Sequence, residues 1–303
     1  MMRNNTRTLL VLLLLLAGAC DLKAQQYPQF SQYMYNGLII NPAYAGSKDY
    51  LSLTGVYRKQ WADFPGAPET ETFTAHGPLS QGKMGLGLVF INDKTSEASK
   101  HMDISAAYAF HIETGSGTFS LGVQGGIAQY STDLSKLRVY DLNDNVAGLN
   151  ESEIFPIASA GLYYYTDKFY AGFSVPQLLT NSPKAAPSLV NHFFLTSGIV
   201  LGSGDNFKLK PSFLLKMTST SPLSYDINLN AFFGKVIGIG VSYRAEDAIV
   251  GLVELQLTPN LRLGYSYDMV QSAIKDFAPA SHEIMLGYDF GHEVPKVRVP
   301  RYF

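Results

Sequence analysis

The chain has 303 residues and a formal net charge of −2 at pH 7, and only 16% of its residues are charged. This charge excludes the basic surface that a nucleic-acid-binding domain needs. Tyr, Phe and Gly are abundant, and no run after residue 24 is apolar enough to form a membrane-spanning helix, so the composition favours β-structure.

Residues 1–24 have the features of a signal peptide. Two arginines precede the apolar run LLVLLLLLAGA, which is too short to cross a bilayer comfortably. Two cleavage sites stay open. LLLLAGAC resembles a lipobox ending at Cys20, the only cysteine, and would give a lipoprotein. Cleavage after Ala24 would instead leave Gln25 first, remove the thiol, and take the net charge to about −4, because three basic residues and one acidic residue are lost. We expect an exported protein in both cases.

Residues 25–50 follow neither the period of a helix nor that of a strand. In QFSQYMYNGLIINPAYAGSKDY (Gln29–Tyr50), aromatic side chains give way to an apolar run, an Asn-Pro turn and a glycine. The proline forces a bend. Such a segment needs apolar cover, so we predict that it folds into the following domain as a plug. A periplasmic arm stays open as the alternative. The candidate plug residues are Phe30, Tyr33, Tyr35, Leu38, Ile39, Ile40, Asn41 and Pro42.

Residues 51–290 alternate apolar side chains with polar or small ones, which is the period of a β-strand. In LRLGYSYD (261–268), Leu and Tyr occupy every second position, and Arg, Gly, Ser and Asp lie between them. Most such segments have 8–12 residues, close to the roughly 9–11 that a tilted strand needs to cross a bilayer. Fourteen can be counted: 51–59, 69–77, 84–93, 101–112, 117–130, 156–166, 168–176, 191–202, 206–217, 224–234, 236–244, 248–258, 260–268 and 281–290.

The links between these segments alternate in length. Links after even-numbered segments are mostly short, such as ETGSG and TDK, whereas several of the others are long, including 131–155, 177–190 and 269–280. A membrane barrel has tight periplasmic turns and longer outer loops. A soluble β-sandwich also alternates, but its loops have no reason to alternate in length. We therefore predict an all-β fold, a transmembrane up-and-down antiparallel β-barrel of about 14 strands with an N-terminal plug-like segment. Both termini would be periplasmic, and 291–303 would form a periplasmic tail.

Charged residues fall on the polar faces of several predicted strands, and we expect them to line the lumen. Both signs are present, so an ordinary polar lumen and an anion-selective pore stay open as interpretations. Three of the cations, Lys208, Lys210 and Arg262, are expected to bond backbone carbonyls of the plug. The candidate lumen-lining residues are Lys208, Lys210, Lys216, Asp226, Arg244, Arg262, Glu283 and Asp289.

No motif for catalysis, a cofactor or a metal stands out. The histidines lie far apart, and we expect most of them at turns or strand ends. Glycines in GLGL (85–88) and GVQGGI (122–127) fit no phosphate loop and more simply make room inside a barrel. DLNDNVAGLNESE (141–153) is faintly like a calcium loop but lacks the glycine and the final glutamate of an EF-hand. We expect neither an enzyme nor a bound cofactor.

Four stretches resemble the PorP/SprF-like membrane proteins of the type IX secretion system: QFSQYMYNGLIINPAYAGS, VYRKQWADFPGAPETETFTAHGPL, HEIMLGYDF and the terminal PRYF. The resemblance runs from about Gln25 to Phe303. It implies an outer-membrane β-barrel of gliding or adhesin-exporting gram-negative bacteria, which helps to secrete proteins with C-terminal sorting domains or holds adhesins at the surface. It also implies contacts with lipoproteins of the machine. NPA at 41–43 resembles the N-terminal hatch of fatty-acid-transporter barrels.

Two functions therefore stay open. The first is an interaction protein of the outer membrane, which anchors secreted adhesins or sorting-domain proteins and contacts periplasmic or outer-membrane lipoproteins. The second is a transport barrel, fatty-acid-transporter-like or porin-like, for a small apolar or anionic solute. With either function the barrel would contact the lipid bilayer, and no nucleic acid is expected as a partner.

Overall fold

The computed structural model describes residues 27–136, 150–179, 190–202, 206–218 and 222–291. These residues form one closed barrel in which each strand pairs antiparallel with its sequence neighbours, and the last strand pairs with the first. The predicted fold class is confirmed. The fourteen strands are β1 (Leu51–Lys59), β2 (Glu69–Leu79), β3 (Met84–Lys94), β4 (Ser99–Thr114), β5 (Gly117–Asp133), β6 (Asn150–Tyr165), β7 (Phe169–Val175), β8 (His192–Ile199), β9 (Phe207–Thr218), β10 (Ser224–Phe233), β11 (Ile237–Arg244), β12 (Ala248–Gln256), β13 (Leu261–Val270) and β14 (Ala280–Phe290).

The links divide the barrel into two unlike ends. At one end, called the short-turn end, the links after even-numbered strands have two to seven residues. At the other, called the long-link end, 134–149 and 176–191 each connect two strands. The predicted difference in link length is therefore present. Residues 141–149 of the stretch considered as a calcium loop lie outside the described residues, and 150–153 belong to β6.

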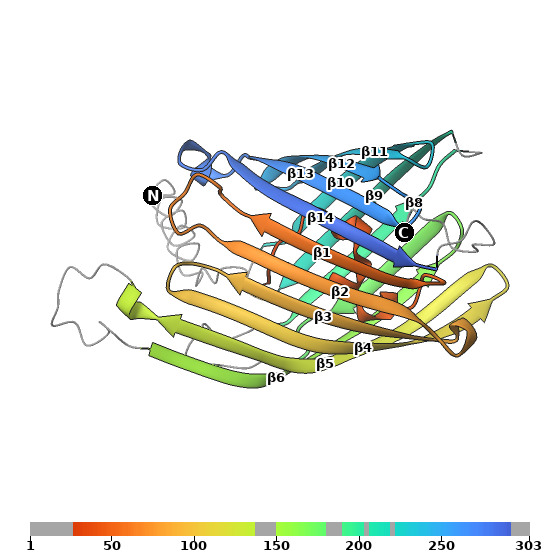
Figure 1. The fold of residues 1–303 in the computed structure, drawn as a ribbon, viewed down its shortest axis with the longest axis horizontal. Helices are drawn as coiled ribbons and strands as arrows, with labels where there is room; N and C mark the ends of the chain where they lie inside the picture. Colours follow the sequence, from red (N-terminus) through yellow and green to blue (C-terminus); the bar gives the residue numbers. More distant parts are fainter. Residues whose placement is uncertain (1–26, 137–149, 180–189, 203–205, 219–221, 292–303) are drawn as a thin grey trace, which may run out of the picture.

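Strands β4, β5 and β6 are longer than their alternating segments, with 16, 17 and 16 residues. Pairing between β5 and β6 continues to Asp133 opposite Asn150, and Figure 1 shows this hairpin reaching beyond its neighbours at the long-link end. Backbone hydrogen bonds between strands do not need apolar side chains, so the ladder outlasts the apolar stretch. Part of the predicted loop 131–155 is consequently strand.

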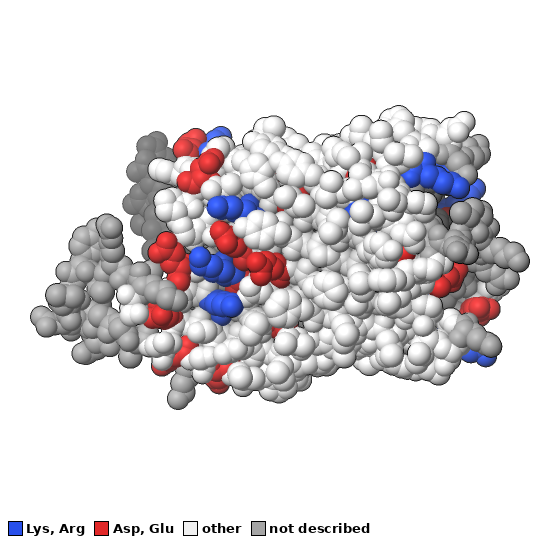
Figure 2. Space-filling model, viewed as in Figure 1, with Lys and Arg blue, Asp and Glu red and all other residues white. Residues whose placement is uncertain are grey.

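The barrel is apolar outside and polar inside. Leu88, Val123 and Ile127 are exposed on the outer face, whereas Arg58 and Arg244 are among the largest fully buried side chains. Figure 2 shows charged residues gathered toward the two ends of one face, with few in the broad band between. This is the surface of a barrel that contacts lipid around its middle.

Residues 27–50, called the luminal segment from here on, lie inside the barrel (Figure 1). The helices of the described residues are single turns of 3-10 helix, and none is long and apolar enough to cross a membrane. Three belong to the luminal segment, and the others lie in links between strands: η1 (Tyr33–Tyr35), η2 (Gly37–Ile39), η3 (Pro42–Tyr44), η4 (Ser80–Gly82), η5 (Leu134–Lys136) and η6 (Ala273–Asp276).

The luminal segment runs the length of the barrel. Its first described residue, Tyr27, lies beside the first residue of β8 at the long-link end, and Lys48 lies beside the first strand at the short-turn end. Strand β14 also ends there, at Phe290. Tyr27 and Phe290 thus lie at opposite ends of the barrel. The termini themselves, in 1–26 and 292–303, lie outside the described residues, and the expectation that both are periplasmic is not tested by them.

We expect the purified barrel to stay folded in mild detergent, because closure leaves no unpaired strand edge. Unheated protein should migrate differently from boiled protein on a denaturing gel, and its circular dichroism spectrum should be β-rich. A helical spectrum, or recovery in the soluble fraction without detergent, would contradict the barrel.

Candidate functional site

The luminal segment turns tightly because of local sequence signals. The Asn41 side-chain oxygen accepts a hydrogen bond from the Ala43 N–H at 2.9 Å and so caps η3. Pro42 occupies the first position of η3, where the N–H that proline lacks would have no helical partner. Gly46 has a φ of +71°, in the left-handed region that favours glycine. The segment therefore crosses the lumen as a chain of turns.

The apolar side chains of the luminal segment form the centre of the interior core. They pack with inward-facing residues of the wall, among them Val89, Ile91 and Leu252. Full burial of a Leu or Ile side chain stabilises a fold by about 1.5–3 kcal/mol relative to exposure. All eight candidate plug residues are buried: Phe30, Tyr33, Tyr35, Leu38, Ile39, Ile40, Asn41 and Pro42.

At the long-link end, Ser31 lies among four buried charged side chains, called the long-link anchor. Its N–H donates to Glu283 Oε2 at 2.8 Å, and the next backbone N–H donates to the other carboxylate oxygen at 2.8 Å. The Ser31 hydroxyl donates to Asp268 at 2.7 Å. Arg58 and Arg244 donate to that hydroxyl at 2.9 and 3.0 Å. Charged hydrogen bonds of this kind are roughly twice as strong as neutral ones.

The charges of the long-link anchor also pair with one another across strands. Arg58 lies 2.8 Å from Asp268 and 3.4 Å from Glu283. Arg244 lies 3.2 Å from Asp268 and 3.7 Å from Asp226. These groups are almost completely buried, so removing one would leave its partners as uncompensated charges in a poorly solvated interior.

At the short-turn end, the luminal segment is held by a second set of polar contacts, the short-turn anchor. Lys48 donates to the Ser52 hydroxyl at 3.2 Å, and this hydroxyl donates to Asp289 at 2.6 Å. Arg262 approaches the other oxygen of Asp289 at 3.4 Å. The two anchors thus fix the segment near both ends of the barrel.

Between the anchors, the wall bonds the backbone of the luminal segment. Carbonyl groups that would otherwise lie unpaired in the interior are thereby satisfied. Three side chains of the wall donate to them: Ser174 to Ile40 at 2.5 Å, Ser120 to Ala43 at 2.7 Å and Lys210 to Met34 at 3.4 Å.

Two tyrosine hydroxyls of the luminal segment bond β10. Tyr33 accepts from the Asn228 amide at 2.6 Å, and Tyr35 donates to the Asn230 carbonyl oxygen at 3.1 Å. Both hydroxyls act as neutral hydrogen-bonding groups.

Glycines on the inner wall make space for the backbone of the luminal segment. A Cβ added to Gly85, Gly122 or Gly161 would overlap atoms of residues 41–46. The sequence-based expectation that inward glycines make room holds for the first two of these. What they make room for is the luminal segment itself.

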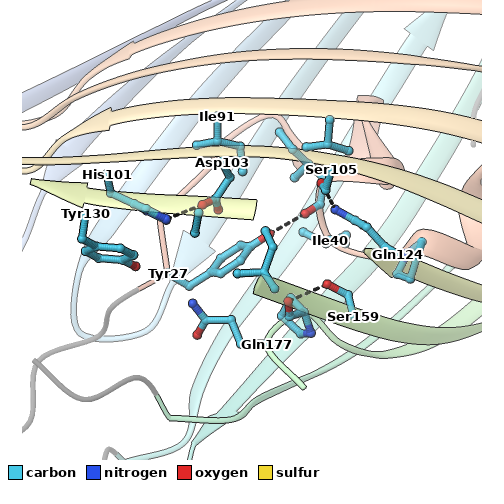
Figure 3. Close-up of a pocket in the computed structure, with 16 residues that line it drawn as sticks. Tyr27, Ile40, Ile91, His101, Asp103, Ser105, Gln124, Tyr130, Ser159 and Gln177 are labelled. Carbon is cyan, nitrogen blue, oxygen red and sulfur yellow. Dashed lines mark hydrogen bonds and ion pairs between the residues drawn. The ribbon is translucent and has the colours of Figure 1, made fainter. Parts of the chain in front are cut away.

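Figure 3 shows a cavity at the long-link end, between the luminal segment and strands β3–β6. It has about 530 Å³ including its open mouth. The Tyr27 ring borders it, and its hydroxyl donates to the Ile39 carbonyl at 2.7 Å. Across the cavity, His101 lies against Asp103 and stacks on Tyr130, with ring centroids 4.0 Å apart. The cavity is the part of the lumen that the luminal segment does not fill beside its N-terminal end.

The predicted lumen-lining residues lie on inward strand faces. Lys216 is half-buried and lies 3.1 Å from Asp226, and Lys208 is half-buried near the opposite end of β9. Lys210 bonds a carbonyl of the luminal segment as expected, whereas Arg262 lies against Asp289 instead. A carboxylate is a stronger acceptor for a guanidinium than a carbonyl is. Six of the eight are buried: Lys210, Asp226, Arg244, Arg262, Glu283 and Asp289.

Several important residues were not singled out from the sequence. Arg58 and Ser31 are central to the long-link anchor. The signal for Arg58 was available, since alternation in LSLTGVYRK puts it on the polar face of its strand. His76, expected at a turn or strand end, lies within β2 and accepts a hydrogen bond from the Gly46 N–H at 3.2 Å. No sequence period could have revealed that contact.

Comparison with known proteins gives one family. The family described as type IX secretion system membrane protein PorP/SprF has a profile that matches residues 22–288 of this chain. Among curated proteins, none matches the chain significantly.

Solved structures resemble the chain only remotely. The outer membrane protein Omp33 of Acinetobacter baumannii has 8% identity and a TM-score of 0.49, over 81% of this chain and 100% of that one. The CymD monoaromatic hydrocarbon channel has 13% identity and a TM-score of 0.47, over 87% and 94%. The translocator domain of the autotransporter NalP from Neisseria meningitidis has 10% identity and a TM-score of 0.44, over 80% and 88%.

We expect Arg58→Met to lower the free energy of unfolding by about 3–5 kcal/mol, because Asp268 and Glu283 would remain buried near Ser31 without their partner. The matched control is Lys59→Met on the same strand. Lys59 forms a largely exposed pair with Glu69 at 3.8 Å, and such pairs contribute only about 0–1 kcal/mol. Denaturant unfolding in detergent micelles measures both, and equal effects would contradict the anchor.

We expect Gly122→Val to displace the luminal segment, because the added side chain meets the backbone of Ala43, and to cost about 1–3 kcal/mol of stability. Gly125→Val is the control on the same strand, since nothing lies within 4 Å of a Cβ at Gly125. Susceptibility of the segment to protease in detergent reports its displacement. If both variants resist protease equally, the glycine does not position the segment.

Proposed function

The chain belongs to the PorP/SprF family of type IX secretion system membrane proteins, and from this premise we propose that it is a docking barrel. It holds secreted adhesins or sorting-domain cargo at the cell surface with its long-link end. Its short-turn end contacts periplasmic lipoproteins of the secretion machine. The proposal includes no catalytic step and no cofactor.

The observation that carries this proposal is the filled lumen. The luminal segment is fixed by two anchors and by hydrogen bonds from the wall to its carbonyls, and glycines of the wall leave room for its backbone. A barrel for a small solute needs a continuous path, and here that path holds a buried core that includes Leu38. In a barrel with a filled lumen, the two end surfaces remain available for binding other proteins. This supports docking over transport.

The two unlike ends support two kinds of contact. Long loops on a rigid scaffold are where binding usually occurs, and 134–149 and 176–191 offer the largest such links. The short turns at the opposite end form a compact rim, suited to contact with a second protein rather than to enclosing a ligand. This division supports contact of the exported partner with the long-link end.

We expect a strain without this protein to lose a specific large surface protein, or its anchoring, while the outer membrane stays intact. Complementation with the natural chain should restore it. A variant in which 137–149 is replaced by a Gly-Ser linker of equal length should insert but fail to restore it, because the docking link is gone. Gly125→Val, on the exposed face of β5 where nothing lies within 4 Å of an added Cβ, is the control and should restore the surface protein. An unchanged surface proteome and unchanged adhesion and gliding in the deletion strain would refute docking.

A further inference from the structure

We propose that the N-terminal end of the luminal segment is displayed at the cell surface. The segment then crosses the outer membrane inside the barrel, from outside to periplasm, before the first strand begins. This deepens the proposed docking function, because it adds Tyr27–Gln29 to the outer face. The role of these residues in docking rests on the proposed function, whereas the path of the chain through the barrel does not.

The start of the luminal segment is fixed at the long-link end by contacts with β8 and β11. The Tyr27 ring lies 6.1 Å from the ring of His192 and 5.5 Å from that of Phe194, at the start of β8. Arg244, the last residue of β11, donates to the Gln29 side chain at 3.4 Å. The beginning of β8 and the end of β11 both border long-link-end connections. Figure 3 shows Tyr27 beside residues from the same end of β4 and β5.

The other end of the luminal segment is fixed at the short-turn end. Lys48 bonds Ser52, the second residue of β1, and lies 3.8 Å from Asp289, near the end of β14. Gly46 packs against Gly85, near the start of β3. The contacts at the two ends therefore use opposite ends of the strands, and the segment spans the barrel once.

The orientation of the barrel follows from its links. Outer-membrane barrels have short periplasmic turns and longer outer loops, which places the long-link end outside. Tyr27 is then at the outer mouth and Lys48 at the periplasmic mouth. A chain released from a signal peptide would be expected to leave its N-terminal end in the periplasm, and the path through the lumen reverses this.

The test places one cysteine at each mouth. Pro28→Cys lies at the proposed outer mouth, where the residue is half-buried, and Asp49→Cys lies at the periplasmic mouth, where it is exposed. The natural chain has one cysteine, Cys20, which is either removed with the signal peptide or blocked by lipid, so the unsubstituted chain is the background control. A membrane-impermeant biotin maleimide is applied to intact cells and to cells with a permeabilised outer membrane.

In intact cells we expect Pro28→Cys to label at least tenfold more than Asp49→Cys, and both to label after permeabilisation. Labelling of Pro28→Cys only after permeabilisation, or equal labelling of both in intact cells, overturns the proposal. If Pro28→Cys labels in neither condition, an epitope inserted immediately before Tyr27 decides. Antibody binding to intact cells supports the surface position, and its absence overturns it. Labelling does not depend on any docked partner, so this test can succeed where the docking proposal fails.

Discussion

The fourteen-stranded wall encloses more space than its own inward side chains fill, and the rest of the structure follows from that constraint. Barrels of eight strands can be filled by side chains, whereas those of sixteen or more leave an aqueous channel. Many inward positions here carry glycine or small polar residues, which makes the space larger still. The luminal segment occupies it. Because a polypeptide brings carbonyls and N–H groups into a dry interior, the wall must supply polar partners for them.

The inward charges are explained by this requirement. Glu283 accepts two backbone N–H groups of the luminal segment, and Arg58 and Arg244 neutralise the carboxylates around Ser31. Charged side chains of both signs thus hold the luminal segment. A filled and anchored lumen makes the barrel a rigid scaffold with two distinct faces. That property fits the proposed docking of partners at the two ends.

Much of the fold could be predicted from the sequence, because alternation with period two directly reports which side chains face lipid. The strand count, the closure and the difference between the two ends all followed from it. The limits were local: β5 and β6 extend as a polar hairpin where alternation of hydrophobicity fades. The anchors could not be predicted, since Ser31 meets Asp268 across 237 positions of sequence. The direction of the luminal segment was equally hidden, because no pattern within residues 27–50 says at which end of the barrel it starts.

Ion conductance in planar bilayers tests the central claim most directly, that the luminal segment closes the barrel. The measurement compares the intact protein with a chain lacking residues 27–45, after a heat-modifiability gel has shown that both barrels are folded and inserted. The account predicts that the intact barrel conducts little, and that the shortened one opens a stable ion conductance, because the space of fourteen strands is then unfilled. A shortened barrel that inserts normally and conducts no more than the intact one would contradict it.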